Sequence, residues 1–341
     1  MIKLSFILPC YNVAPYVGRC IESIEAQDIS QAEYEVICVD DCSKDNTVEV
    51  IKEYQKQYPN IRLICHTENK TAGGARNTGM DAAKGEYLWF VDPDDAIVEK
   101  ILGTLWQQIE EKEVDILFFN YNYIGEDNVA HPVLQFDGNQ KVMRGQDFFM
   151  TYCKRKRLAE VPSIWREVFR AKFLKENDIR YPEIKSSQDV VFAWHSYLLA
   201  LKITAISTTA YNHMRRAAST TGSKGTYKAI NLISTSIYYT EEIWQILNTI
   251  PMHEQYKKDL QHDIEISVND ETQKLFRMSI SERNLYFDEL INNSELVDKF
   301  RPYMNRRSKI LYNYNLPRWV WNTAIILYKK YDEMFRRKEY N

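Results

Sequence analysis

No stretch of this 341-residue chain reaches the ~20 consecutive apolar residues that a membrane-spanning helix requires. The amino terminus, MIKLSFILPCYN, carries one lysine and an apolar run too short for the core of a secretory signal. These absences predict a cytoplasmic protein. Internal repeats and low-complexity segments are absent as well, so a repeat architecture is not expected.

Common cysteine, histidine and glycine motifs are also missing. The six cysteines contain no CxxC pair, and the six histidines contain neither HxxxH nor HExxH. Cys38 and Cys65 lie inside apolar runs, so the thiols are expected to be buried and reduced. The turn PCYNVAPY has no glycine, which argues against a dinucleotide-binding GxGxxG loop.

The composition is that of an ordinary globular protein, with 45% apolar and 27% charged residues, and the length allows one large or two modest domains. From Arg301 onward there are 10 Lys and Arg against 3 Asp and Glu, which leaves 34 against 44 in the first 300 residues. A basic end on an acidic body favours a negatively charged surface as a partner, and no nucleic-acid partner is expected.

Apolar strand-like runs alternate with helical spacings through the first hundred residues. We expect strands at Leu4–Pro9, Tyr34–Val39, Ile61–Cys65 and Tyr87–Val91, and helices after Tyr16, after Asp45 and at Ala75–Ala83. This alternation predicts an α/β fold with a Rossmann-like, mostly parallel sheet flanked by helices. Ligands of such sheets bind at the carboxyl ends of the strands.

The pattern loosens after Asp95. The expected elements are a helix over 97–112, a strand at Asp115–Asn120, a polar loop region over 121–145, a further run at Ser163–Phe169, helices over 171–177 and from Asp189 to about Leu201, and short strands at Ile203–Ser207 and Ala210–Met214. Beyond Lys224 the chain is expected to be almost entirely helical.

Three carboxylates, Asp92, Asp94 and Asp95, follow the predicted strand YLWFV. Concentrated negative charge at a sheet edge costs stability unless a cation or hydrogen-bond donors compensate it. Mg²⁺ typically takes one or two carboxylates plus phosphate oxygens. The cluster therefore indicates a divalent metal bound to a diphosphate, although an acidic turn with Asp95 capping a helix explains it equally well.

A second acidic pair, Asp40 and Asp41, ends the strand YEVICV. Carboxylates accept hydrogen bonds from a pyrimidine imide or from ribose hydroxyls. The neighbouring Ser43, Asp45 and Asn46 fit a turn and a helix cap equally well. Two strands that both end in paired acids are harder to explain by capping alone.

The segment GGARN lies between these acidic strand ends. Its two glycines permit close backbone approach at a helix start, and Arg76 can pair with phosphate. In the turn after the first strand, Pro9, Tyr11 and Asn12 are placed to cradle a base or a ribose.

Four ordered motifs, FILPCYN, VDDCSKDNT, GGARNTG and GEYLWFVDPDD, resemble those of the inverting glycosyltransferase family 2, which has the GT-A fold. The match is close over residues 1–96 and continues through SIWREVFRAKFLKENDIRY, SSQDVVF and YNHMRRAAST. The resemblance implies a catalytic domain at 1–220, with a nucleotide-binding half at 1–96 and an acceptor half at 97–220. A helical region at 221–341 follows.

The resemblance implies a UDP-linked sugar donor and a divalent cofactor, Mn²⁺ or Mg²⁺. Asp92 and Asp94 occupy the metal-binding DxD positions, with Asp94 as the main ligand and Asp92 nearer the ribose or sugar. The residues implied in nucleotide binding are Pro9, Tyr11, Asn12, Asp40, Asp41, Arg76 and Asp92, with Asp41 on the base.

Inversion is a single displacement in which an acceptor hydroxyl attacks the anomeric carbon opposite the departing diphosphate, so it requires a general base. In similar proteins a Glu-Asp pair that opens a later helix supplies this base, and Gln188 and Asp189 match it here. The resemblance makes Asp189 the base, while Gln188 removes any role that needs charge there. A lone acid favoured by the helix dipole is the alternative reading of Asp189.

The resemblance also suggests acceptor or diphosphate contacts at Trp165, His213 and Arg216. Trp165 fits a sugar-stacking face or core packing equally well. His213 stands where the family usually has an aromatic residue, and a structural role suits it better than a catalytic one.

After Pro317, apolar residues follow helical spacing on one face: Val320, Ala324, Leu327, Tyr331 and Met334. Basic residues lie nearby, so the helix over 317–338 is predicted to lie in a membrane interface, at the inner face of the cell membrane. Packing on its own domain or on a second subunit of an oligomer is the alternative.

The predicted activity is therefore sugar transfer from a nucleotide diphosphate to an acceptor hydroxyl, in polysaccharide or glycolipid biosynthesis. One alternative is a sugar-1-phosphate nucleotidyltransferase, although PCYNVAPYVGR poorly matches the glycine-rich triphosphate loop of that class. A non-enzymatic nucleotide-sugar-binding module is the other, and the intact Asp92, Asp94 and Asp189 argue against it.

Overall fold

The computed structural model describes residues 2–153, 163–184, 188–214, 241–242, 244–252, 254, 257–258, 261–262, 265, 275–276 and 278–336. Its contacts divide the chain into two compact units. The first unit comprises Met1–Glu183 and Gln188–Thr220, and the second comprises Ile184–Ser187 and Thr221–Asn341. The functional halves expected at 1–96 and 97–220 stay a prediction.

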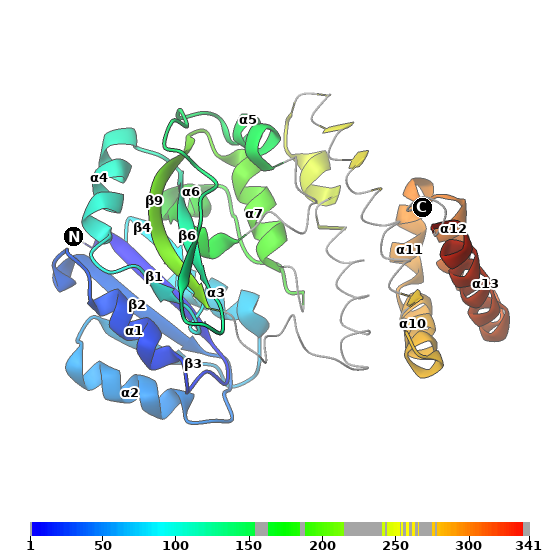
Figure 1. Cartoon of the computed structure of the whole chain (residues 1–341), viewed down its shortest axis with the longest axis horizontal. Helices are drawn as coiled ribbons and strands as arrows, with labels where there is room; N and C mark the ends of the chain where they lie inside the picture. Colours follow the sequence, from blue (N-terminus) through cyan, green and yellow to red (C-terminus); the bar gives the residue numbers. More distant parts are fainter. Residues whose placement is uncertain are drawn as a thin grey trace. The chain divides into compact units, whose positions relative to one another are not determined.

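A mixed sheet forms the centre of the first unit (Figure 1). Its strands within the described residues are β1 (Leu4–Cys10), β2 (Tyr34–Asp40), β3 (Ile61–Cys65), β4 (Tyr87–Phe90), β5 (Ala96–Ile97), β6 (Ile116–Ile124), β7 (Ala130–Val133), β8 (Glu167–Arg170) and β9 (Ile203–Met214). The order is β3-β2-β1-β4-β8-β6-β9-β5, with β7 paired to β6. The first four are parallel, whereas β8 runs antiparallel to β4 and β6. The predicted α/β fold is confirmed.

Helices cover both faces of the parallel strands because successive strand residues point to opposite faces. Phe6 and Leu8 join the core beneath α1 (Val17–Glu25), α2 (Thr47–Gln57) and α4 (Leu102–Lys112). Ile7 points the other way, to α3 (Thr71–Ala82), where a Cβ added at Gly79 would lie 2.4 Å from Ile7 Cγ2. Glycine at 79 therefore lets α3 lie close against β1. The other α-helices among the described residues of this unit are α5 (Gly145–Phe148), α6 (Ala171–Glu176) and α7 (Gln188–Leu199).

Several predicted boundaries were wrong. The helix expected over 97–112 begins at Leu102, because Ala96–Ile97 form β5 and pair with β9. The region expected to be loop over 121–145 carries the end of β6 and all of β7, which pair with each other. The two short strands expected after residue 203 are one strand, β9, whose pairing with β6 is irregular around Asn120.

The cysteine prediction was only partly right. Cys10, Cys20 and Cys38 are buried and free, and burial raises the pKa of the Cys20 thiol well above its usual value. Cys65 is free but exposed, because it ends β3, which is the edge strand of the sheet. Among the described cysteines none forms a disulfide.

The second unit is helical over its described residues. Its helices include α10 (Ile280–Asn292), α11 (Ser294–Phe300), α12 (Arg306–Leu311) and α13 (Arg318–Arg336). Trp321 and Ile325 of α13 are fully buried, and Trp321 Nε1 donates to the carbonyl of Leu311 at 2.7 Å. No helix within the described residues is long and apolar enough to cross a membrane.

Glu167 on β8 is a buried acid that the sequence did not single out. Its side chain is fully buried, and the Tyr197 hydroxyl donates to Oε1. Burial raises the pKa of this carboxyl to about 8, while Arg166 opposes the shift. Glu167 is therefore protonated in the folded protein at neutral pH.

The folded pKa of Glu167 lies above its unfolded value near 4.5, so its contribution to stability is present below pH 4.5 and is lost as the pH rises towards 8. Glu167→Gln keeps the acceptor for Tyr197 and abolishes this dependence. We expect the variant to gain about 3 kcal/mol over the wild type between pH 5 and pH 8. Urea unfolding at both pH values measures the gain, and the exposed Glu86→Gln serves as control. An equal stability difference at both pH values would contradict the prediction.

Candidate active site

The segments after β1 and β2 and the first residue of α3 carry backbone strain. Asn12, Cys42 and Thr71 have positive φ angles of 52°, 64° and 68°. Such conformations are costly for non-glycine residues and concentrate at binding sites. The loops also brace each other, since Asn12 N donates to Ser43 Oγ at 3.0 Å and Lys44 N donates to Asn12 Oδ1 at 2.7 Å. Asn12 thus shapes this edge through its backbone and side chain.

Asp41, predicted to contact the base, is buried and already well bonded. Its Oδ1 accepts the backbone N–H of Lys70 at 2.7 Å and lies 2.7 Å from His66 Nδ1. His66 Nε2 in turn lies 2.9 Å from Thr78 Oγ1 on α3. Asp41 therefore ties β2 to the loop before α3. His66 was missed by the sequence reasoning, because a lone histidine after a strand carries no motif.

Among the residues predicted to bind the nucleoside, Asp40 and Tyr11 each have a group that a ligand could contact. Asp40 Oδ2 accepts Ser43 N at 3.2 Å, but the buried Oδ1 has no hydrogen-bond partner among the described residues. A buried carboxylate oxygen without a donor is unfavourable until a ligand supplies one. Tyr11 is 49% exposed, as a stacking residue would be, and it follows Cys10, which pairs with Asp40 between β1 and β2. Pro9 lies within β1.

The three aspartates after β4 divide into two kinds. Asp95 is buried and accepts hydrogen bonds from the Tyr211 hydroxyl at 2.8 Å and from Met214 N at 2.7 Å. Asp92 and Asp94 remain partly exposed. Asp95 therefore anchors the turn to β9, and the helix-capping reading of Asp95 was wrong because β5 rather than a helix follows it.

Arg76 of α3 reaches the turn. Its Nη2 donates to Asp92 Oδ1 at 2.8 Å, and its buried Nε has no hydrogen-bond partner among the described residues. The guanidinium lies over the Tyr181 ring, 5.4 Å from the centroid. Asn77 holds Tyr181 by two hydrogen bonds of 2.9 Å to its backbone. Tyr181 was missed, because it comes from a loop remote in sequence.

Asp189 lies in the first turn of α7 and is close enough to Arg76 and Asp92 for both to shift its titration. Burial raises the pKa of the Asp189 carboxyl, and Arg76 opposes the rise. The adjacent Gln188 is buried, and its Nε2 donates to Thr71 Oγ1 at 3.1 Å. Gln188 therefore fastens the start of α7 to the start of α3.

Two of the residues predicted to contact the acceptor or the diphosphate, Trp165 and His213, pack around the turn after β4. Trp165 is only 9% exposed and is stacked on Tyr211 and His213, with centroids 4.6 and 5.2 Å apart. His213 Nδ1 lies 3.2 Å from Asp95 Oδ2, and this contact raises the pKa of the imidazole. Both residues serve the packing around the turn. Arg216 lies outside the described residues.

The turn after β4 fits a divalent cation that is shared with a ligand. Among the described residues, no three His, Cys, Asp or Glu side chains form a group able to hold a metal. Asp92 and Asp94 offer two partly exposed carboxylates, the number that Mg²⁺ takes when phosphate and water complete its octahedron.

The profile of the family described as glycosyl transferase family 2 matches residues 5–174. Glycosyltransferase GlyG of Streptococcus pneumoniae is 32% identical over 228 residues, which cover 63% of this chain and 72% of GlyG. The chain belongs to glycosyl transferase family 2.

Two further relatives concern poly(ribitol phosphate). The poly(ribitol-phosphate) β-glucosyltransferase of Bacillus spizizenii is 31% identical over 62% of this chain, and TarS of Staphylococcus aureus, a poly(ribitol-phosphate) β-N-acetylglucosaminyltransferase, is 30% identical. The chain spans about a third of the length of these curated relatives, 32% and 35% respectively.

A solved structure confirms the fold. Residues 1–349 of TarS in complex with UDP-GlcNAc match with a TM-score of 0.71 at 22% identity, covering 99% of this chain and 92% of that one. The α/β sheet flanked by helices is thus the GT-A fold of the family 2 enzymes.

In this family 2 chain, Tyr181→Leu should lower kcat/KM about tenfold, because the ring supports the buried Arg76 through a cation–π contact worth ~1–2 kcal/mol. Tyr181→Phe should leave kcat/KM nearly unchanged, since the buried hydroxyl has no hydrogen-bond partner among the described residues. Steady-state kinetics with varied donor, together with Tm, measures both. Equal losses in the two variants would refute support by the ring.

Proposed function

We propose that this chain transfers a sugar from a UDP-sugar to a hydroxyl of a polyol-phosphate or polysaccharide acceptor, with inversion at the anomeric carbon. The observation that carries the proposal is the convergence of Arg76, Asp92 and Asp189 in a family 2 chain. Relatives named for poly(ribitol phosphate) support the acceptor class, and the UDP-GlcNAc complex of TarS supports the donor.

The donor's nucleoside would bind at the strained edge after β1 and β2. The exposed Tyr11 ring offers a stacking surface, and the unpartnered Asp40 Oδ1 offers an acceptor for a ribose hydroxyl or an imide N–H. The existing bonds of Asp41 to Lys70 and His66 weaken the prediction that Asp41 contacts the base. Asp41 is better suited to fixing the loop that the nucleoside touches.

The reaction would be one displacement. Asp189 accepts the proton of the acceptor hydroxyl while its oxygen forms a bond to the anomeric carbon. The bond from that carbon to the diphosphate oxygen breaks, and its electron pair leaves with UDP. Arg76, charged and buried beside Asp92, stabilises the negative charge on the departing diphosphate.

Asp92 and Asp94 would hold Mn²⁺ or Mg²⁺, which when bound neutralises charge growing on the leaving group. The pairing of Asp92 with Arg76, at 2.8 Å, orients that carboxylate at the turn. Asp94 is held through its backbone, since Arg19 Nη2 donates to its carbonyl at 2.6 Å.

A thermal-shift screen with UDP-glucose and UDP-GlcNAc, with and without Mn²⁺, tests donor binding, because a ligand of the folded state raises its apparent stability. Release of UDP on addition of poly(ribitol phosphate) then tests transfer. Pyrophosphate formation from UTP and a sugar 1-phosphate would favour the nucleotidyltransferase alternative instead. A thermal shift without turnover on any acceptor would favour the binding module.

The second unit would supply contact with an anionic membrane. Trp319 and Leu327 of α13 are 73% and 62% exposed, and the exposed Lys330 lies on the same helix. Because Trp321 and Ile325 belong to the core, the test replaces only the exposed pair, Trp319→Ser with Leu327→Ser. The variant should lose co-sedimentation with phosphatidylglycerol vesicles while keeping its Tm. Undiminished co-sedimentation would refute the contact.

A further inference from the structure

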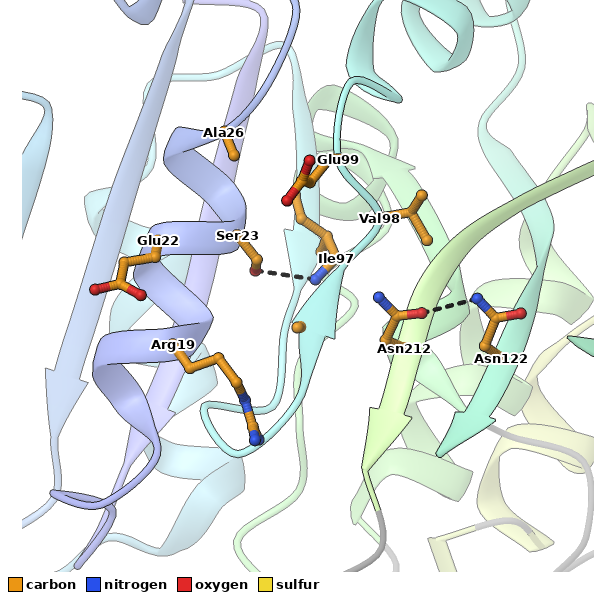
Figure 2. A pocket seen from close by; sticks show the side chains of 10 residues that line it. Arg19, Glu22, Ser23, Ala26, Ile97, Val98, Glu99, Asn122 and Asn212 are labelled. Atoms are coloured by element: carbon orange, nitrogen blue, oxygen red, sulfur yellow. Dashed lines mark hydrogen bonds between the residues drawn. The ribbon is translucent and has the colours of Figure 1, made fainter. Parts of the chain in front are cut away.

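A hollow lies in the first unit, between α1 and the strands β5 and β9. Its volume is about 650 Å³. Figure 2 shows Arg19 and Ser23 on the α1 side, Asn212 on the β9 side, and β5 between them. The strand β5, Ala96–Ile97, contributes the small side chain of Ala96 to the lining of this hollow. We call this hollow the α1–β9 groove.

Two polar groups of the α1–β9 groove are held in place by the fold. Asn122 Nδ2 donates to Asn212 Oδ1 at 2.8 Å, which occupies the acceptor end of the Asn212 amide and fixes its orientation. The Nδ2 end of Asn212 then projects on the groove side of β9 (Figure 2). Arg19 is fixed by its bond of 2.6 Å to the Asp94 carbonyl. Groups fixed in advance bind a ligand with less loss of entropy.

The chemistry of the lining selects the kind of ligand. None of the described lining residues is aromatic, so the groove lacks a stacking surface for a nucleobase. Arg19 is the one cation in this lining, which also includes Glu22 and Glu99, so a free phosphate is disfavoured. The same lining offers donors from Arg19 and Asn212, the exposed carboxylate of Glu99, and the small aliphatic side chains of Ala26 and Ala96. A neutral compound rich in hydroxyls satisfies both kinds of group.

We propose that the α1–β9 groove binds one saccharide or polyol unit of the acceptor polymer, away from the unit that reacts. The inference rests on the proposed function for the identity of the polymer. Arg19 connects the groove to the turn that carries Asp94, so a unit bound there lies beside the donor-side turn. Holding a second unit raises the effective concentration of the acceptor end at the reacting site.

The test is ligand-observed saturation-transfer NMR on the full chain with saturating UDP and Mg²⁺, which occupy the donor site. The probes are ribitol, glucose and N,N′-diacetylchitobiose. We expect saturable transfer to at least one probe, with binding at least tenfold weaker in Asn212→Asp. That change keeps the acceptor for Asn122 and replaces the groove-side donor by a carboxylate oxygen. Asn128→Asp, on an exposed loop, is the matched control and should bind as the wild type does.

Glu99→Ala is the second variant, because Glu99 is exposed and its replacement should leave the fold intact. It should weaken the same probe at least threefold. Transfer to none of the probes, or transfer unchanged in both groove variants, would overturn the proposal. The experiment involves no turnover, so its failure is separate from that of the proposed function. If the chain binds a probe but consumes no UDP-sugar, the groove proposal stands and the proposed activity is refuted.

Discussion

Asp189→Asn should lower kcat about 1,000-fold, because a general base contributes ~10²–10⁴ to the rate. It should leave the dissociation constant of the UDP-sugar within about twofold, because in the proposed mechanism Arg76 and not Asp189 contacts the diphosphate. The amide is nearly isosteric with the carboxylate but cannot take the acceptor's proton. Single-turnover transfer measures kcat, and titration with UDP measures donor binding.

The matched control is Asp178→Asn, since Asp178 is exposed and its positive φ of 50° suits asparagine equally well. It should keep full activity. A loss of less than tenfold in Asp189→Asn would remove Asp189 from the role of base and leave it as a helix-start acid.

The pH dependence of kcat/KM tests the role of Asp189 as general base in a second way. Burial raises the pKa of Asp189, with Arg76 opposing. Because the base must be ionised, kcat/KM should fall as the pH drops through this raised pKa. The acid limb should therefore lie at higher pH than for an exposed aspartate, and it should vanish in the residual activity of Asp189→Asn.

Asp94→Ala should lower kcat/KM about 1,000-fold at any Mn²⁺ concentration, because it removes one of the two carboxylates that would hold the cation at the diphosphate, a contribution of several kcal/mol. Its fold should be intact, since Asp94 is partly exposed and its backbone carbonyl, which Arg19 binds, is kept in the variant. Chelation of the wild type with EDTA should produce the same loss, and added Mn²⁺ should restore the wild type alone.

Asp95, the buried residue next to Asp94, should respond differently to replacement by alanine. Asp95→Ala would leave Tyr211 and Met214 without their acceptor and should lower Tm sharply, whereas Asp94→Ala should not. If Asp94→Ala loses activity only in proportion to its Tm, the metal role of Asp94 is refuted and the turn is purely structural.

Much of the first unit was predictable because its signals are local. The strand at Ile61–Cys65 was placed with its observed bounds, and the acidic strand ends followed from their position after apolar runs. The errors came where long-range pairing overrides local pattern. Ala96–Ile97 resemble a helix start in sequence, yet they become β5 because β9 supplies hydrogen bonds from more than a hundred residues away.

The sequence by itself determined the α/β class, the carboxyl edge that carries Asp40 and Asp92, and membership of a sugar-transferring family, since these depend on periodicity and ordered motifs. Only the tertiary structure decided which acids are already bonded. Asp95 and Asp41 are bonded by partners on β9 and before α3, whereas Asp40 Oδ1 has none among the described residues. Hydrogen bonds between segments that are distant in sequence produce no periodic pattern in that sequence. They are therefore identified only from the tertiary structure, in which these segments lie side by side.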